Sequence, residues 1–271
     1  MSQESSAAAV VAQGIGKTFD TKAGDVQALT GVDLAVTAGE FVSLIGPSGC
    51  GKSTLMRLIA DLDSPTKGTL EVFGKPPAQA RRDQDYGIAF QQAGLLPWRT
   101  VGANIGVALE LHGMAKAARR ERVAELAELV GLTDFVDSYP DQLSGGMQQR
   151  VAIARSLAEQ PRLLLMDEPF GALDEMTRER MQAELSRIVG ESGAAVVFVT
   201  HSIPEAVFLS DRVVVMSPRP GRITDVVSIG IEREVPRDEA LRERSEFFAK
   251  VTEVREALHG GKVGSGAREG R

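Results

Sequence analysis

The stretch GPSGCGKST at residues 46–54 constrains the fold of this chain more than any other feature. It follows an apolar run of strand length at 41–45 and precedes residues 55–60, whose apolar members have helical spacing. Glycine adopts backbone angles that other residues avoid, so successive N–H groups of such a loop can turn towards one anion, and the dipole of the following helix adds positive charge. The stretch therefore predicts a phosphate-binding loop between a strand and a helix.

Every position of this loop is a candidate for nucleotide binding. Lys52 is expected to reach the β- and γ-phosphates, and the Ser53 hydroxyl is expected to bind Mg²⁺. The alternative is a glycine-rich turn that merely precedes a helix, but it does not explain why all motif positions are filled. The chain is thus predicted to bind a nucleoside triphosphate through these residues: Gly46, Pro47, Ser48, Gly49, Cys50, Gly51, Lys52, Ser53 and Thr54.

The composition is that of an acidic chain without a long apolar segment. Among 271 residues, 31 basic and 37 acidic side chains give a net charge of −6, which argues against a nucleic-acid partner. The longest apolar runs, such as 194–199, are far shorter than the roughly 18 residues that cross a bilayer. The only cysteine, Cys50, lies inside the loop, so no internal disulfide can form and a reducing cytoplasm fits. We expect Cys50 to fill space rather than to serve redox chemistry.

The second half of the chain alternates strand and helix patterns. Apolar runs at 163–166, 194–200 and 213–216 are separated by helical patterns at 175–189 and 203–209. This alternation is typical of an α/β fold with a mostly parallel sheet covered on both faces. Ligands of such sheets bind beyond the carboxyl ends of the strands. Four candidate residues follow such ends: Gly46, Asp167, Glu168 and His201.

Two other regions have different patterns. Residues 10–36 hold short alternating stretches broken by glycines, which predict antiparallel strands beside the nucleotide core. Residues 101–130 have a helical pattern, which predicts an insertion between two halves of the core. We therefore expect a disordered tail, an α/β domain, a helical subdomain inserted into it, a C-terminal helix and a flexible tail, at 1–9, 10–235, about 95–158, 236–259 and 260–271.

Asp167 and Glu168 end a continuous apolar run. A carboxylate at the end of a buried strand is costly without a charge partner, and Mg²⁺ held together with Ser53 would be that partner. Glu168 is placed to polarise an attacking water. The alternative, a pair of acids capping a loop before Pro169, leaves the apolar run unexplained.

Three further side chains each have two interpretations. His201 follows a predicted strand and can contact a γ-phosphate or be an ordinary surface or core histidine. Gln91 also follows a strand and can bind Mg²⁺ and the attacking water or simply be exposed. Phe19 can lie against an adenine ring or be a plain core aromatic. None of the three decides the function by itself.

A second candidate anion site consists of Ser144, Gly145 and Gly146, which begin a helical pattern. A hydroxyl and free N–H groups meet there at the positive end of a helix dipole. The alternative is an ordinary helix N-cap softened by glycine. One nucleotide does not need two such pockets within one chain.

Taken with these motifs, the sequence resembles the ATP-binding cassette ATPases of membrane transporters between residues 10 and 223. The loop GPSGCGKST matches the Walker A motif of that family, LLLMDEP the Walker B motif and LSGGMQQR the signature motif. Gln91 matches the Q-loop, His201 the H-loop and Phe19 the adenine-stacking A-loop position, while GALD at 171–174 matches the D-loop.

The resemblance implies a P-loop NTPase core that works as a head-to-tail dimer with two ATP molecules between the copies. Each ATP would lie on the loop of one copy and under Ser144, Gly145 and Gly146 of the other, which accounts for the second anion site. The resemblance also implies roles for these residues: Asp174 at the nucleotide, Glu168 as general base, His201, Lys52 and Gln91 in catalysis, and Ser53, Gln91 and Asp167 at Mg²⁺.

A finer resemblance concerns the cargo. LLPW at 95–98, SIPEA at 202–206 and SPRPGRI at 217–223 are similar to segments of importers for nitrate, sulfonates, taurine and related small solutes. This implies an ATP hydrolase on the cytoplasmic face of the membrane, with integral permease subunits as direct partners and a solute-binding protein as an indirect one. Trp98 is then either an ordinary packing residue or a contact with the permease.

Other classes of protein explain the sequence less well. Non-transport cassette ATPases that act on nucleic acid or ribosomes tend to carry coiled coils, zinc insertions or two cassettes, and the sequence has none of these patterns. A GTP-dependent switch would need an Asn-Lys-x-Asp motif, whereas the only asparagine, Asn104, precedes isoleucine. A binding module without catalysis would be expected to lack Glu168 or His201.

Overall fold

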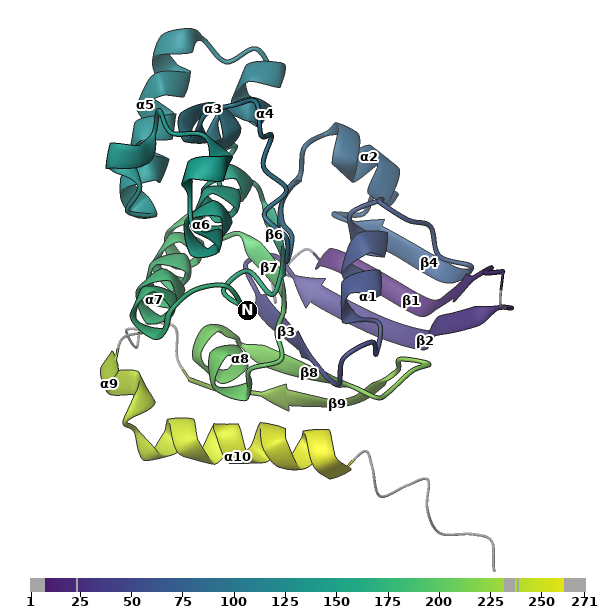
Figure 1. Cartoon of the computed structure of the whole chain (residues 1–271). Helices are drawn as coiled ribbons and strands as arrows, with labels where there is room; N and C mark the ends of the chain where they lie inside the picture. The colour runs from purple at the N-terminus through teal and green to yellow at the C-terminus, as the bar shows by residue number, and fades with distance from the viewer. Residues whose placement is uncertain (1–7, 23, 232–236, 238, 261–271) are drawn as a thin grey trace, which may run out of the picture.

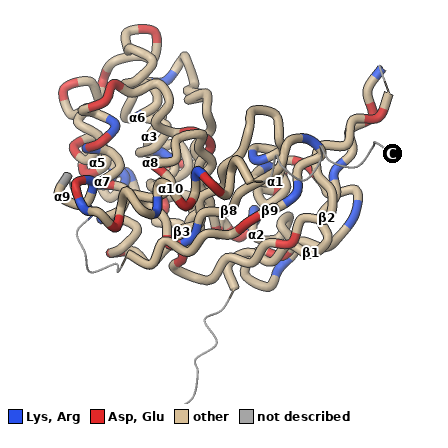
Figure 2. The backbone as a smooth tube through the Cα atoms, turned by 90° about the horizontal axis from the view of Figure 1, so that it is seen from below, with Lys and Arg blue, Asp and Glu red and all other residues tan. Residues whose placement is uncertain are grey.

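The structure, a computed structural model, describes residues 8–22, 24–231, 237 and 239–260. It contains a six-stranded sheet, a three-stranded sheet and a group of helices that stands beside them (Figure 1). Lysine, arginine, aspartate and glutamate are spread over all three parts, as Figure 2 shows along the backbone. Within the described ranges, none of the helices combines the length and the hydropathy that a membrane span requires.

The central sheet has the order β5-β6-β7-β3-β8-β9, in which only the last pair is antiparallel. Every residue of β3, β6 and β7 is buried, as their continuous apolar runs predict. The predicted α/β fold with a mostly parallel sheet is thus confirmed. The strands are β3 (Phe41–Ile45), β5 (Tyr86–Ala89), β6 (Leu163–Asp167), β7 (Ala195–Val199), β8 (Arg212–Met216) and β9 (Ile223–Ser228).

The N-terminal strands form a separate antiparallel sheet, as predicted, from β1 (Ala8–Phe19), β2 (Val26–Thr37) and β4 (Lys67–Val72). Two details of the prediction were wrong. Strand β2 runs on through Gly31, because this glycine takes a φ of +57° at a shift in register and does not end the strand. Ala8 and Ala9 belong to β1 and not to a tail, because Ala8 pairs with Thr37. Residues 1–7 lie outside the described part.

The helical insertion is present, but region 101–130 contains three helices and not one continuous helix. They are α3 (Val101–Ile105), α4 (Val107–Leu111) and α5 (Lys116–Leu129). Gly106 ends α3, and Gly113 follows α4 with a φ of +77°, a conformation that an α-helix cannot contain. The chain continues through the 3₁₀ turns η1 (Thr133–Phe135) and η2 (Pro140–Gln142) to α6 (Gly145–Ser156).

Each face of the central sheet has its own core. Helices α7 (Glu175–Ser192), α8 (Ile203–Leu209) and the helical subdomain cover one face, while α1 (Lys52–Ile59), α2 (Pro77–Arg82) and the antiparallel sheet cover the other. Side chains of β3 alternate between these cores, with Phe41 and Ile45 in the first and Val42 and Leu44 in the second. This double burial fixes the position where β3 ends and the loop 46–54 begins.

The single C-terminal helix predicted at 236–259 is two helices, α9 (Glu239–Arg242) and α10 (Ser245–Gly260). A turn separates them, in which Arg244 N donates to Leu241 O. Helix α10 packs along α8, β8 and β9 (Figure 1). Gly260, expected in the tail, is the last residue of α10, and residues 232–236, 238 and 261–271 lie outside the described part.

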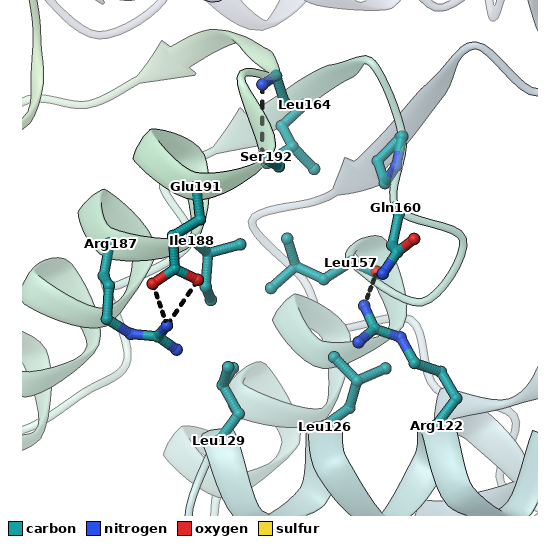
Figure 3. A pocket seen from close by; sticks show the side chains of 12 residues that line it. Arg122, Leu126, Leu129, Leu157, Gln160, Leu164, Arg187, Ile188, Glu191 and Ser192 are labelled. Atoms are coloured by element: carbon teal, nitrogen blue, oxygen red, sulfur yellow. Dashed lines mark hydrogen bonds and ion pairs between the residues drawn. The ribbon is translucent and has the colours of Figure 1, made fainter.

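A cavity of about 460 Å³ lies where the helical subdomain meets α7 (Figure 3). Both of its arginines have partners: Arg122 donates to Leu157 O at 2.9 Å, and Arg187 pairs with Glu191 at 2.7 Å. Its wall includes Leu126, and no residue of the loop 46–54 lines it. This cavity is therefore not the phosphate site that the sequence predicts.

Candidate nucleotide-binding site

The carboxyl ends of three neighbouring parallel strands bring the predicted site residues together. The loop 46–54 follows β3, Glu168 follows β6, and His201 lies two residues beyond β7. A second cavity, of about 480 Å³, opens between them. Its lining residues are Phe19, Val26, Ala28, Ser48, Gly49, Cys50, Gly51, Lys52, Ser53, Thr54, Gln91, Glu168, His201 and Arg219. Gly46 and Pro47 line an adjoining cavity together with Ser48 and His201.

The loop has the conformation that its glycines predict. Gly49 and Gly51 have φ values of +73° and +101°, and Gly51 stands at the N-terminus of α1. Gly46 lies so close to β8 that an added Cβ would be 2.7 Å from Met216 O. Cys50 is buried and free, as expected of a residue that fills the loop. The turn therefore aims the first N–H groups of α1 into the cavity.

Lys52 lies inside the loop and not in solvent. Its side chain reaches back over the turn, and Nζ donates to Gly46 O at 2.8 Å and to Pro47 O at 3.2 Å. Only 7% of the residue is exposed, so its charge is concentrated at the cavity. A cation held in this way is placed to pair with phosphate oxygens.

Asp167 and Ser53 meet at the floor of the site. The Ser53 hydroxyl donates to Asp167 Oδ1 at 3.0 Å, across 114 residues of sequence. Burial raises the pKa of the Asp167 carboxyl, the hydrogen bond from Ser53 and the charge of Lys52 oppose that rise, and Glu168 adds to it. A buried carboxylate of this kind is stabilised by a cation.

The oxygen donors at this point suit Mg²⁺. Among the described residues no cluster of three or more histidines, cysteines, aspartates or glutamates could hold a metal alone. The Ser53 hydroxyl, the Asp167 carboxylate and the Gln91 amide oxygen are the nearby candidates, and Mg²⁺ usually takes one or two protein carboxylates and completes its shell with phosphates and water.

Glu168 is the only non-glycine residue of the site that has a left-handed backbone among the described residues, with φ at +46°. The chain turns there, and Glu168 N donates to Val199 O at 2.9 Å. Its Oε2 accepts from Gln91 Nε2 at 3.1 Å and lies 3.3 Å from His201 Nδ1. Backbone strain of this type concentrates at functional sites, and here it holds one carboxylate oxygen between the Q-loop and H-loop side chains.

Phe19 lies half-buried on the cavity wall, not in the core, with Lys17 Nζ 4.8 Å from its ring centroid. Arg219 lines the same cavity from the β8–β9 connection. No sequence pattern predicts a site role for Arg219, although SPRPGRI contains it. One aromatic and one cationic side chain therefore line this cavity together with Val26 and Ala28.

The signature residues and Asp174 are not brought to this cavity. Ser144 caps α6 by accepting from Met147 N at 3.3 Å, and Asp174 caps α7 by accepting from Thr177 N at 3.0 Å. Ser144, Gly145 and Asp174 are exposed. Gly146 packs on the D-loop, since an added Cβ would lie 3.1 Å from Ala172 O. The signature and D-loop residues thus form a second, separate surface.

Two residues that the sequence analysis did not single out connect the signature helix to the Q-loop. Buried Gln149 donates to Phe90 O at 2.9 Å, and Arg155 donates to Ala93 O at 2.7 Å and to Gly94 O at 3.0 Å. Gln149 lies within LSGGMQQR, but no sequence signal indicates its partner. Helix α6 therefore holds the segment that contains Gln91.

Known proteins share this architecture. The ABC transporter family model matches residues 29–171. The chain is 49% identical over 238 residues to an uncharacterized ABC transporter ATP-binding protein of Methanocaldococcus jannaschii, covering 88% of each chain. It is 43% identical over 250 residues to the nitrate import ATP-binding protein NrtD of Synechocystis sp., covering 91% of this chain and 93% of that relative.

A solved ATP-binding cassette in a dimeric, post-hydrolysis state, bound to ADP and phosphate, has a TM-score of 0.75 and 35% identity to this chain. The likeness covers 81% of this chain and 98% of the solved one. The chain therefore belongs to the ABC transporter family, as a subunit that binds and hydrolyses ATP.

Proposed function

We propose that this chain powers an importer as a head-to-tail dimer, with each ATP between the loop 46–54 of one copy and Ser144–Gly146 of the other. One observation carries the proposal: Ser144 and Gly145 are exposed at a helix start, outside the cavity that contains the loop. A helix start leaves its first N–H groups without partners inside the helix, so they remain available to a phosphate. The dimeric state of the solved cassette supports the same arrangement.

Hydrolysis in this arrangement depends on Glu168. Its Oε2 lies between Gln91 Nε2 and His201 Nδ1, so the carboxylate is oriented when water attacks the γ-phosphate. Glu168 accepts a proton from that water, and His201 donates to the transferring phosphoryl group while Lys52 offsets its charge. Mg²⁺, held by Ser53, Asp167 and Gln91 when bound, would neutralise charge on the phosphates. Loss of the γ-phosphate removes contacts across the interface and lets the dimer open.

The membrane partner in this proposal is a separate permease, with a solute-binding protein acting through it. Trp98 follows the Q-loop and is 72% exposed, which favours a contact with a partner over ordinary packing. The segment that contains Trp98 follows the two carbonyl groups to which Arg155 donates. A displacement of this segment by the partner can therefore be transmitted to Gln91. The chain would thus lie peripherally on the cytoplasmic face of the membrane.

The solute in this proposal belongs to the nitrate, sulfonate and taurine class. The 43% identity to a nitrate import subunit, over 93% of that relative, supports this class. The segments LLPW, SIPEA and SPRPGRI support it as well.

The Glu168→Gln variant tests the dimer directly. Glutamine keeps the shape and the hydrogen bond to Gln91 but accepts no proton, so the variant should bind ATP and stall before hydrolysis. We expect light scattering with Mg²⁺ and ATP to show the mass of two chains, and the mass of one chain with ADP. A variant that stays a single chain at saturating ATP would refute the dimer.

A further inference from the structure

Four polar side chains from separate elements form a hydrogen-bonded chain that ends beside His201. Thr200 follows β7, Glu205 lies in α8, Gln182 in α7 and Arg242 in α9. Thr200, Glu205 and Gln182 are buried, and Arg242 is partly buried. Helix α9 lies at the lower end of α7 in Figure 1, on the far side of α8 from the phosphate loop. This hydrogen-bonded chain therefore joins the C-terminal part of the molecule to the nucleotide site.

With Glu205 ionised, the direction of every hydrogen bond in this hydrogen-bonded chain is fixed. Arg242 has only donors, and its Nη2 donates to Gln182 Oε1. That contact turns the amide so that Gln182 Nε2 donates to Glu205 Oε1 at 2.8 Å. The Thr200 hydroxyl donates to Glu205 Oε2, which leaves the lone pairs of Thr200 Oγ1 free to accept. Reversing one bond would oppose two donors or two acceptors.

The last hydrogen bonds of this hydrogen-bonded chain fix the backbone on both sides of His201. Ser202 N donates to Thr200 Oγ1 at 3.0 Å, and the Ser202 hydroxyl accepts from Glu205 N at 3.4 Å. On the other side, Thr200 N donates to Leu44 O in β3 at 3.3 Å. The His201 side chain is 69% exposed, and its Nδ1 lies 3.3 Å from Glu168 Oε2, so the turn that carries it sets much of its position.

Holding a turn with a buried carboxylate costs free energy, because the charge is removed from water. Burial raises the pKa of Glu205, while hydrogen bonds from Thr200 and Gln182 and the charge of Arg178 oppose that rise. Apolar residues often fill such positions at lower cost. Arg242, the cationic end of the hydrogen-bonded chain, has two further contacts that hold it in place. Its guanidinium lies 4.1 Å from the ring centroid of Phe208, and its Nε lies 3.6 Å from Glu179 Oε1.

We infer that Glu205 is a positioning residue for His201, and that Arg242 extends this positioning to α9. The inference rests on the role proposed above for His201 at the transferring phosphoryl group. It assigns the C-terminal helix α9 to the hydrolytic machinery: displacing α9 would release Gln182, then Glu205, and then the turn that carries His201.

The test uses the full chain with three disrupting substitutions, one conservative variant and one control. Glu205→Gln leaves one acceptor oxygen for the two donors Thr200 and Gln182, Thr200→Val removes the hydroxyl, and Arg242→Gln removes the cation. Thr200→Ser keeps the hydroxyl and should restore the wild-type behaviour. Arg244→Gln is the control, because Arg244 is exposed in the same segment. The sequence has three histidines, so the imidazole NMR signal of His201 can be followed with His112 as an internal reference.

We expect Glu205→Gln, Thr200→Val and Arg242→Gln to shift the His201 signal, leave the His112 signal in place, and lower kcat about tenfold at unchanged ATP Kd. An unmoved His201 signal in both Glu205→Gln and Arg242→Gln would overturn the inference. A moved signal at unchanged kcat would instead support the positioning and refute the catalytic role proposed for His201. If Arg242→Gln unfolds, Thr200→Val against Thr200→Ser decides the matter with the same signal.

Discussion

The two halves of the proposed nucleotide site differ in how much of them one chain completes. The half built on the loop 46–54 is enclosed: Lys52 and Asp167 are each 7% exposed, and both have hydrogen-bond partners. The half built on the signature motif is open, with Ser144, Gly145 and Asp174 exposed at helix starts. The loop half is ordered by hydrogen bonds within one chain, whereas the signature half presents exposed helix starts.

This difference has a physical consequence. Pre-organised groups bind a phosphate without paying again for their ordering, so the loop half alone should give ATP affinity. The open half adds contacts only when a second copy approaches, so it should contribute to dimerisation and hydrolysis and not to the affinity of a single chain. The substitutions below are designed to separate these two contributions.

The largest effect is expected for Lys52→Ala, which removes the buried cation of the loop half. ATP affinity should fall about 100-fold or more, because a charge-assisted contact to the phosphates is lost, and hydrolysis should fall with it. Calorimetric titration of ATP into the full chain measures this change. Unaltered binding would show that the loop is not the phosphate site.

A different outcome is expected for Ser144→Arg in the open half. The bulky side chain would block the helix start, so kcat should fall about 100-fold while ATP binding to the single chain stays the same. Thr252→Arg, at an exposed position of α10, is the matched control and should leave both values unchanged. If ATP affinity fell as far in Ser144→Arg as in Lys52→Ala, the division between the halves would be wrong.

Smaller effects are expected on stability, and they have opposite signs for Asp167 and Asp174. The folded pKa of Asp167 is raised above its unfolded value, so its contribution to stability falls as pH rises between those two values and stays reduced above them. Asp167→Asn should therefore stabilise the nucleotide-free chain at pH 8 by about 1 kcal/mol, or about 2–4 °C in Tm, with the gain shrinking at acidic pH.

For Asp174, in the open half, the contribution to stability changes with pH in the opposite direction. Hydrogen bonds from Thr177 lower its pKa, so its contribution to stability is present above the unfolded pKa and is lost as pH falls through the folded one. Asp174→Asn should not stabilise the chain at pH 8. Thermal unfolding of both variants at pH 8 and at pH 5 makes the comparison, and a gain in both would remove the contrast between enclosed and open carboxylates.

That the residues of the enclosed half lie together at one edge of the sheet was predictable from the sequence, because the signals are local. Continuous apolar runs that lead to Gly46, Asp167 or His201 indicate parallel strands whose carboxyl ends meet. Glycines in the loop indicate the turn. Those patterns give the order of the chemistry along the chain without any knowledge of side-chain contacts.

Contacts between distant segments were not predictable in the same way. The bonds of Gln149 to Phe90 and of Arg242 to Gln182 depend on side-chain conformations and on packing that no periodicity encodes. The same holds for Ala8, because alanine has no strand signal and joins β1 only through its pairing with Thr37. The end of helix α4 is set locally by the left-handed backbone of Gly113. The apolar spacing is helical on both sides of this glycine, so the spacing alone does not show the break.

The most direct test of the two-copy site mixes two variants that each fail alone, both in the Glu168→Gln background. One carries Lys52→Ala and keeps only its signature half, and the other carries Ser144→Arg and keeps only its loop half. With Mg²⁺ and ATP, neither should dimerise by itself, whereas the mixture should form a dimer that holds one ATP per two chains, measured by light scattering and nucleotide counting. A mixture that stays as single chains, or a Ser144→Arg variant that forms an ATP-bound dimer by itself, would contradict the account.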